Sequence, residues 1–284
     1  MKNNISLTII SAFVVIAFVI IFLSWQNNSA VVSRYEYKNS KLGIKLNGFK
    51  IVHISDLHNK NFYGRLCNAI KDISPDIIVI TGDLIDRRLT RVDIATDFIG
   101  QIANIAPIYY VSGNHEQLSA SYDELKEELI KLDVNILDNE YMTLNQSGEI
   151  IGVMGLADPA LIYTEGNNNN GRNRIYAESN LKKLCENSVT EFNILLSHRP
   201  ELIEVYKNMN IDLVFSGHAH GGQIRIPFAG AVLSPNQGFF PKYSEGMITE
   251  DNTTIVISRG LRNSIFPFRI FNRPELIVVE FKMS

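Results

Sequence analysis

The sequence has little of what marks several common classes of protein. Its 284 residues include two cysteines and one tryptophan, and 27 lysine and arginine residues face 30 aspartate and glutamate residues. Two cysteines without a spacing pattern exclude a disulfide framework and a structural zinc site built on thiolates. Cys67 and Cys185 instead fall on the apolar sides of predicted helices and are expected to be buried. A net charge of −3 leaves no basic surface for a nucleic-acid backbone, so we expect no nucleic-acid partner.

Only one long hydrophobic run is present, and it lies at the N-terminus. Residues 5–25 carry no charge and are long enough for a helix that crosses a membrane, which takes about 20 residues. A secretory signal has a shorter apolar region and a small-x-small cleavage site, whereas Asn28 stands where a small residue is needed. After a tail of residues 1–4, the run therefore predicts a single-pass anchor in the cell membrane, with cleavage of this segment as the disfavoured alternative. The flanking basic residues weakly favour a cytoplasmic body, and the membrane side stays open.

The rest of the chain divides into a connecting region and one domain. Residues 26–45 are polar and mixed and run into the alternating stretch 41–50, which is typical of an edge strand. We therefore predict a linker and entry strand over 26–45, followed by a domain over 46–284. In this domain apolar strands alternate with amphipathic helices, which predicts an α/β body with several parallel strands. The strand-rich last third predicts a second, more antiparallel sheet.

Five predicted strands each lead into side chains of the kinds that bind metal ions. In open α/β sheets ligands bind at the carboxyl ends of strands, so we expect the five loops to form one site. The residues that follow the strands, in chain order, are Asp56 and His58; Asp83, Asp86 and Arg87; Asn114 and His115; His198; and His218 and His220.

The types of these side chains indicate the chemistry of the site. His218 and His220 point to the same side if the segment is extended, and Asp56 and His58 have the same spacing. Of the six histidines, only His53 lies within a strand, where it faces away from Asp56 and is expected to be structural. Carboxylates, imidazoles and one amide without thiolates suit manganese, iron or zinc at a catalytic site. Seven candidate ligands are too many for one ion and fit two ions that share a carboxylate.

In their order, the loops strongly resemble the five motif blocks of the calcineurin-like metallophosphoesterase superfamily: D-x-H, G-D-x-x-D, G-N-H-D/E, H and G-H-x-H. The resemblance covers about residues 46–281 and implies an α/β fold of two packed mixed β-sheets flanked by helices. It also implies a metal site of seven residues: Asp56, His58 and His220 on one ion, Asn114, His198 and His218 on the other, and Asp83 as the bridge.

The resemblance further implies catalytic roles. A hydroxide that bridges the ions would attack phosphorus, and His115 would protonate the leaving oxygen or stabilise charge on the phosphoryl group. Asp86 would orient His115, and Arg87 would touch phosphate. Glu116 is expected to support its loop rather than bind metal. Arg199 suits a solvated helix start as well as it suits a substrate contact.

The segments ISDLH, SHRPE and SGHAHGGQIRIP, together with ISRGL and NRPEL, narrow the resemblance. They are similar to those of anchored or exported bacterial phosphoesterases, among them hydrolases of UDP-2,3-diacylglucosamine. Arg262 departs from that branch, which often has glycine there, and its side chain would narrow or charge the rim of the site. Gln223, Arg225 and Arg259 are further rim candidates for an anionic group.

The sequence therefore predicts a membrane-anchored hydrolase with two divalent ions, manganese first. Its substrate would be a lipid-linked or envelope phosphoester, phosphodiester or pyrophosphate, such as a UDP-diacyl-sugar, or another phosphorylated small molecule. Two alternatives within the same class are a phosphodiesterase of an envelope polymer and a phosphomonoesterase. An alternative from a different class is a catalytically silent scaffold, which a loss of metal ligands would favour. None of the seven ligands is lost.

Overall fold

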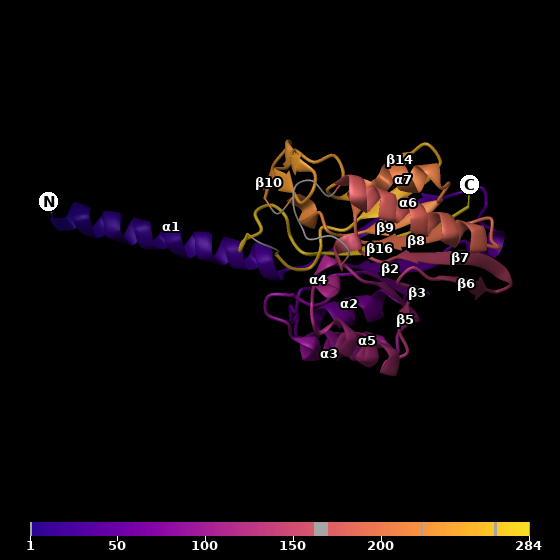
Figure 1. Cartoon of the computed structure of the whole chain (residues 1–284). Coiled ribbons are helices and arrows are strands. Elements are labelled where there is room, and N and C mark those ends of the chain that lie inside the picture. Colours follow the sequence, from indigo (N-terminus) through magenta and orange to yellow (C-terminus); the bar gives the residue numbers. More distant parts are fainter. Residues whose placement is uncertain (1, 162–169, 223, 264–265, 284) are drawn as a thin grey trace.

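Two six-stranded sheets form the centre of the molecule and pack against each other (Figure 1). The computed structural model describes residues 2–161, 170–222, 224–263 and 266–283. The first sheet consists, in spatial order, of β1 (Val31–Lys38), β16 (Glu275–Lys282), β2 (Lys50–Ile54), β3 (Ile77–Thr81), β4 (Ile108–Val111) and β5 (Asn135–Ile136). The second consists of β14 (Gly246–Glu250), β15 (Thr253–Ile257), β9 (Leu213–Ser216), β8 (Asn193–Ser197), β7 (Glu149–Leu156) and β6 (Tyr141–Gln146).

Both sheets combine parallel and antiparallel strands. β2, β3, β4 and β5 are parallel, as are β7, β8, β9 and β15. The antiparallel pairs are β16 with β2, β6 with β7, and β14 with β15. The two mixed sheets implied by the resemblance are thus confirmed. The second sheet is the more antiparallel of the two, as predicted, with two antiparallel pairs against one in the first. The strands of the last third do not all belong to it, because β16 joins the first sheet.

Helices cover the outer faces of the two sheets (Figure 1). α2 (Arg65–Ile73), α3 (Val92–Ile102) and α5 (Tyr122–Lys131) pack on the first sheet, and α6 (Asn170–Asn187) and α7 (Ile203–Asn208) pack on the second. One apolar core lies between each sheet and its helices. A third, which includes Ile51, Phe215 and Ile277, lies between the two sheets. Each such side chain contributes about 1.5–3 kcal/mol by its burial, so the two sheets are fixed against each other and their strand ends meet.

Short elements fill the connections between the layers. They are α4 (Asn114–Gln117), the 3₁₀ helices η1 (Ile44–Leu46), η2 (Pro159–Leu161), η3 (Pro200–Leu202) and η4 (His220–Gly222), and two small hairpins, β10 (Arg225–Ile226) with β11 (Gly230–Ala231) and β12 (Leu233–Ser234) with β13 (Gly238–Phe239). Cys67 and Cys185, which were predicted to be buried, are half-buried and form no disulfide.

The N-terminal helix α1 (Lys2–Asn28) extends away from the body (Figure 1). Its segment Ile9–Asn28 has a mean hydropathy of 2.5 and is almost entirely exposed, with Phe13 and Phe18 each 69% exposed. Among the residues that the structure describes, α1 is the one helix long and apolar enough to cross a membrane. By length and composition it therefore suits a membrane span.

The region 26–45, predicted as a linker and entry strand, contains β1 at 31–38, which is an edge strand of the first sheet. Only two residues separate the end of α1 from β1, and the strand does not lie in the alternating stretch 41–50. That stretch forms a turn and η1 instead. Leu42 and Leu46 are both buried while Ile44 is 74% exposed, because residues four apart share a face when the chain turns helically.

Candidate metal centre

The predicted loops meet where the carboxyl ends of parallel strands from both sheets come together. β2 leads to Asp56 and His58, β3 to Asp83, and β9 to the segment of His218 and His220. α4 begins at Asn114 directly after β4, and His198 follows β8. All seven candidate ligands are buried, with exposed fractions of 6% or less. The structure therefore brings the whole predicted set together.

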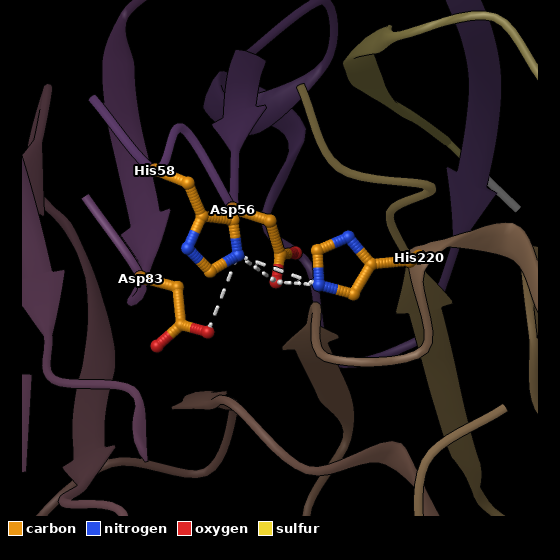
Figure 2. A group of neighbouring side chains, drawn as sticks. All are labelled: Asp56, His58, Asp83 and His220. Carbon is orange, nitrogen blue, oxygen red and sulfur yellow. Dashed lines mark hydrogen bonds and ion pairs between the residues drawn. The ribbon is translucent and has the colours of Figure 1, made fainter. Parts of the chain in front are cut away.

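The first ligand group consists of Asp56, His58 and His220 (Figure 2). The His220 Nε2 atom lies 3.3 Å from Asp56 Oδ1 and 3.4 Å from His58 Nε2. The His58 Nε2 atom is 3.9 Å from the same carboxylate oxygen. With Asp83, these side chains place one ligand atom each within 4.8 Å of one another, a separation that a single cation can span.

The second ligand group consists of Asn114, His198 and His218. The His198 Nε2 atom lies 3.2 Å from Asn114 Oδ1 and 3.2 Å from His218 Nδ1. An amide oxygen and two imidazole nitrogens thus converge on one point. In contrast to the first group, the second contains no carboxylate of its own.

Asp83 lies between the two groups. Its Oδ2 atom is 3.6 Å from His58 Nε2 and 3.3 Å from His198 Nε2. Its other oxygen, Oδ1, accepts a hydrogen bond of 2.8 Å from the backbone N–H of His115. This hydrogen bond fixes the carboxylate so that Oδ2 faces a histidine of each group.

Backbone carbonyls set the tautomers of two histidines. The Nδ1–H of His198 donates to the Thr81 carbonyl at 2.7 Å, and the Nδ1–H of His220 donates to the Arg262 carbonyl at 3.1 Å. Because a carbonyl can only accept, the Nε2 atoms of both rings are left with their lone pairs directed into the site. Partners of this kind orient metal-binding histidines and raise their basicity.

The site gathers many acceptor atoms that face one another. Asp56 Oδ1 is buried without a hydrogen-bond partner. Burial lowers the pKa of His58 and of His218 well below the ordinary histidine value, which keeps both rings neutral. Burial also acts to lower the pKa of His198, but the Asp83 carboxylate outweighs it and raises that pKa to about 10, so without a cation nearby this ring takes a second proton on Nε2 and places one positive charge beside two carboxylates. A cluster of buried lone pairs and carboxylates fits divalent cations, which would supply the positive charge that the cluster lacks.

The backbone of the ligand loops is unusual. Five of the seven candidate ligands have a left-handed conformation, with φ of 55° at Asp56, 44° at His58, 54° at Asp83, 62° at His218 and 49° at His220. Aspartate and histidine adopt this region more readily than most residues. Conformations of this kind cost about 1–3 kcal/mol each and gather at functional sites.

Glycine provides the space for the ligands at two close approaches. A Cβ atom on Gly217 would lie 1.9 Å from Ser55 Oγ and 2.5 Å from Asp56 Oδ2. A Cβ atom on Gly113 would lie 2.2 Å from Asp83 Oδ1. Any larger residue at either position would displace a candidate ligand.

Glu116 connects two of the ligand loops, as predicted. Its Oε2 atom accepts hydrogen bonds from the backbone N–H groups of Asp83 at 2.7 Å and Gly113 at 2.8 Å, and its Oε1 atom accepts one from Ile85 at 3.1 Å. Burial, and then the nearby Asp83 carboxylate, raise the pKa of Glu116 to about 8. Glu116 therefore holds the loops after β3 and β4 against each other.

His115 lies over the first group, with its ring centroid 4.4 Å from that of His58. Its Nδ1 atom accepts a hydrogen bond of 3.1 Å from the backbone N–H of Arg87. Asp86, which the resemblance assigns to orient His115, has its Oδ1 atom 3.7 Å from Nδ1, beyond hydrogen-bond distance. That oxygen accepts from the backbone N–H of Arg88 instead, at 2.9 Å.

Other singled-out residues have structural surroundings. His53 is fully buried, its Nε2 lies 2.8 Å from Thr81 Oγ1, and burial lowers its pKa to about 3. Arg199 is not a solvated helix-start residue, because its side chain is buried and forms a bidentate pair with Asp158, at 2.7 and 2.9 Å. The buried carboxylate holds the guanidinium away from solvent.

The rim candidates differ from one another. Arg225 pairs with Glu245, and Arg259 pairs with Glu275 at 2.9 Å. Each of these two cations thus has a carboxylate partner. Arg262 donates to the backbone carbonyl of His58, and Gln223 lies outside the described residues.

Sequence reasoning missed two supports of the metal site. The amide of Asn236 lies 3.1 Å from His218 Nε2, and the carbonyl of Arg262 accepts from His220. Neither has a local signal, because Asn236 follows a short hairpin strand and any residue at 262 offers a carbonyl. Only the tertiary fold brings them to the ligands.

Comparisons with known proteins agree with this geometry. The family described as calcineurin-like phosphoesterase matches residues 49–222, more than half of the chain. An uncharacterized metallophosphoesterase of Bacillus subtilis, YkuE, is 29% identical over 260 residues, which cover 89% of this chain and 85% of the relative. The UDP-2,3-diacylglucosamine pyrophosphatase LpxG of Chlamydia muridarum is 25% identical, with 98% of this chain and 96% of the relative covered. The phosphodiesterase YaeI of Escherichia coli is 27% identical, with 82% of each covered.

Proposed function

The chain belongs to the calcineurin-like phosphoesterase family, and from this premise we propose that it is a two-metal phosphohydrolase that acts on phosphate-bearing substrates at a membrane surface. The observation that carries the proposal is the position of Asp83. One of its oxygens lies 3.6 Å from a histidine of the first group and 3.3 Å from a histidine of the second. A carboxylate shared in this way allows two ions to be held close together.

The residues present suit a pair of divalent ions, with Mn²⁺ as the expected ion and iron or zinc as alternatives. Asp56, His58 and His220 would hold the first ion, and the second ligand group would hold the other. Such a pair supplies a nucleophile by lowering the pKa of water and neutralises charge that develops on the phosphoryl oxygens. The protein contributes the fixed positions of the ligands, set by the hydrogen bonds to Thr81, Arg262 and Glu116.

His115 is suited to stabilise the charge that develops on the phosphoryl and leaving oxygens. Its Nδ1 atom accepts from the backbone N–H of Arg87, and a neutral imidazole with one accepting nitrogen carries its proton on the other. The proton of His115 is therefore on Nε2, where it can form a hydrogen bond with an oxygen of the substrate. We infer that Asp86, at 3.7 Å from Nδ1, assists by its charge rather than by a hydrogen bond, and that Arg87 contacts the substrate phosphate.

The substrate class follows from α1. A catalytic body tied to an apolar helix of this length reaches phosphate groups at the bilayer surface most readily. A relative of similar length is named for its action on UDP-2,3-diacylglucosamine, so we infer a lipid-linked pyrophosphate or phosphodiester. A cell-envelope polymer or a phosphomonoester stays as an alternative within the same chemistry.

Turnover of a simple phosphodiester tests the proposal. We expect full-length protein loaded with Mn²⁺ to hydrolyse bis(p-nitrophenyl) phosphate, and His115→Ala to lose roughly 10²–10³-fold in kcat, the range of a lost electrostatic stabiliser. Asp97→Ala, which removes an exposed carboxylate on α3, should match the wild type. Lack of turnover by metal-loaded wild type, or unchanged turnover in Asp83→Ala, would favour a silent scaffold.

A substrate screen tests the finer assignment. UDP-diacyl-sugars, glycerophosphodiesters and phosphomonoesters would be compared in one detergent with one metal. We expect the amphiphilic pyrophosphate to have the highest kcat/KM. Equal rates for water-soluble monoesters would contradict a lipid-linked substrate and leave the two-metal chemistry intact.

A further inference from the structure

A cavity of about 670 Å³ lies between the end of α1 and the body. Its α1 wall includes Ile20, Leu23 and Asn27, and its body wall includes Lys60, Arg262 and Phe268. We call it the anchor pocket. Its volume is within the range of about 300–1,000 Å³ that is usual for ligand sites, and it is distinct from the metal centre, because none of the seven candidate ligands lines it.

The anchor pocket is built on a fixed junction between α1 and the body. Asn27 Oδ1 accepts hydrogen bonds from Asn263 Nδ2 at 2.8 Å and from the backbone N–H of Arg269 at 3.0 Å. The Phe22 ring packs edge-on against Phe271 at 5.6 Å, and the Arg273 guanidinium lies 4.6 Å above the Trp25 ring. Figure 1 shows the segment after β15 (yellow) beside the end of α1. The two walls therefore belong to one structure.

One end of the anchor pocket is positively charged. Lys60 donates to the Asn27 carbonyl, and Arg262 donates to the His58 carbonyl. Neither makes an ion pair within the described residues, and no described residue that lines the pocket is acidic. An anion in this end would meet two positive side chains and no competing carboxylate.

The other end of the anchor pocket is apolar and continues into the exposed surface of α1. Ile20 is 61% exposed and Phe268 is 44% exposed. They lie beside Leu23 and Pro267 in the pocket wall. Because Ile20 and Leu23 come from the last turns of the candidate membrane span, a hydrocarbon chain could run from the pocket along the apolar surface of α1.

We propose that the anchor pocket binds a lipid with a phosphate-bearing headgroup, with its phosphate against Lys60 and Arg262 and its chain between α1 and Phe268. The charged end and the apolar end match the two parts of such a molecule, and the order of the ends matches the direction of a lipid in a bilayer crossed by α1. Arg262 also contacts His58, and its carbonyl accepts from His220. A lipid bound there would lie directly beside the first ligand group.

Photo-crosslinking in nanodiscs tests the proposal with the full-length protein. Phosphatidylcholine nanodiscs would carry a small fraction of a diazirine-bearing phosphatidic acid or, in parallel, a diazirine-bearing phosphatidylcholine, and labelled peptides would be mapped by mass spectrometry. We expect phosphatidic acid to label residues 20–28 and 266–271 at least fivefold more than phosphatidylcholine does, since each basic side chain near an anionic lipid contributes a factor of about five. Equal labelling by both lipids would mean that the pocket only contacts the surrounding bilayer and does not select a headgroup, which would overturn the proposal.

Two variants make the outcome specific. Lys60→Glu should remove the preference for phosphatidic acid, whereas Lys71→Glu, which reverses an exposed charge at the end of α2, should keep it. Phe268→Asp, at a half-exposed position where folding is little at risk, should also remove labelling and serves if Lys60→Glu does not fold. A preference that survives both pocket variants would refute the site.

Two further measurements distinguish lipid-borne phosphate from free phosphate, and the lipid site from the proposed two-metal function. Millimolar inorganic phosphate should leave labelling by the lipid unchanged. If phosphate abolished the labelling, the site would take free phosphate rather than lipid. Hydrolysis of bis(p-nitrophenyl) phosphate in the same nanodiscs reports on the two-metal chemistry alone. Labelling without turnover would support the lipid site and contradict the proposed function. Turnover without labelling would support the proposed function and contradict the lipid site.

Discussion

The two ligand groups meet at one carboxylate but differ in charge. The first has a carboxylate of its own, Asp56, whereas the second consists of an amide and two imidazoles. Both groups are buried, so solvent cannot make up the difference. A divalent cation is attracted more strongly by the group with more negative ligands, and we therefore expect the first group to hold its ion more tightly than the second.

The two groups also differ in how the protein positions them. All three ligands of the first group have a left-handed backbone, but only His218 does in the second. In the second group, His198 and His218 each have a hydrogen-bond partner behind the ring, at Thr81 and Asn236. In the first group His220 has one, at the Arg262 carbonyl, whereas His58 Nδ1 has none among the described residues. The fold thus positions the neutral group largely by itself, whereas the charged group combines strained backbone with stronger attraction for the ion.

The largest effect should come from the residue that the groups share. Asp83→Asn removes the one carboxylate that faces both, so we expect both ions to bind weakly and turnover to fall by more than about 10³-fold, since a single lost electrostatic stabiliser already costs roughly 10²–10³. Metal content by mass spectrometry should drop from two ions toward none. Retention of one tightly bound ion would show that the groups do not depend on Asp83 equally.

Moving the carboxylate charge from the first ligand group to the second should reverse the order of their metal affinities. Asp56→Asn should weaken the first site at least tenfold, and Asn114→Asp, which has nearly the same size, should tighten the second by a similar factor, because one ligand charge is lost or gained near the ion. Isothermal titration with Mn²⁺ into metal-free protein would measure both. An unchanged order of affinities in the double variant would argue against charge as the cause.

A smaller effect, confined to the second metal site, is expected when the partner of His218 is removed. Asn236→Ala removes the amide 3.1 Å from His218 Nε2, and loss of such an outer partner costs about 10–100-fold in metal affinity or activity. Only the weaker of the two binding steps should change. Asn252→Ala, in the exposed turn between β14 and β15, serves as the control, and a shift in the tighter step would contradict the assignment of Asn236 to the second group.

The smallest effect on turnover concerns the buried pair that follows His198. Arg199→Met with Asp158 intact leaves a buried carboxylate unpaired, so we expect a loss of about 3–5 kcal/mol in the free energy of unfolding with little change in kcat per folded molecule. Urea denaturation measures the first and metal-saturated turnover the second. A large fall in kcat at full folding would mean that Arg199 acts on the second group directly.

The ligands themselves were predictable because each lies within four residues of the end of an apolar strand, and five such loops occur in one chain. The orientation of Asp86 was not, because its carboxylate binds the nearby Arg88 N–H rather than the His115 ring. The Arg199 pair was hidden because Asp158 lies 41 residues away in the chain. The position of β1 was mistaken because an alternating pattern in 41–50 also satisfies a turn and a helical segment with Leu42 and Leu46 on one face.

The two-residue junction between α1 and β1 sets the reach of the catalytic loops. Two residues span at most about 7 Å when fully extended, and Arg273 binds Ser29 at both the carbonyl and the hydroxyl, at 2.8 and 2.7 Å. With α1 in a membrane, the body cannot swing out on a tether, and its metal centre stays at one height above the lipid. Such an enzyme would search for its substrate by lateral diffusion in two dimensions, at a rate governed by the density of the lipid in the plane rather than by its concentration in solution.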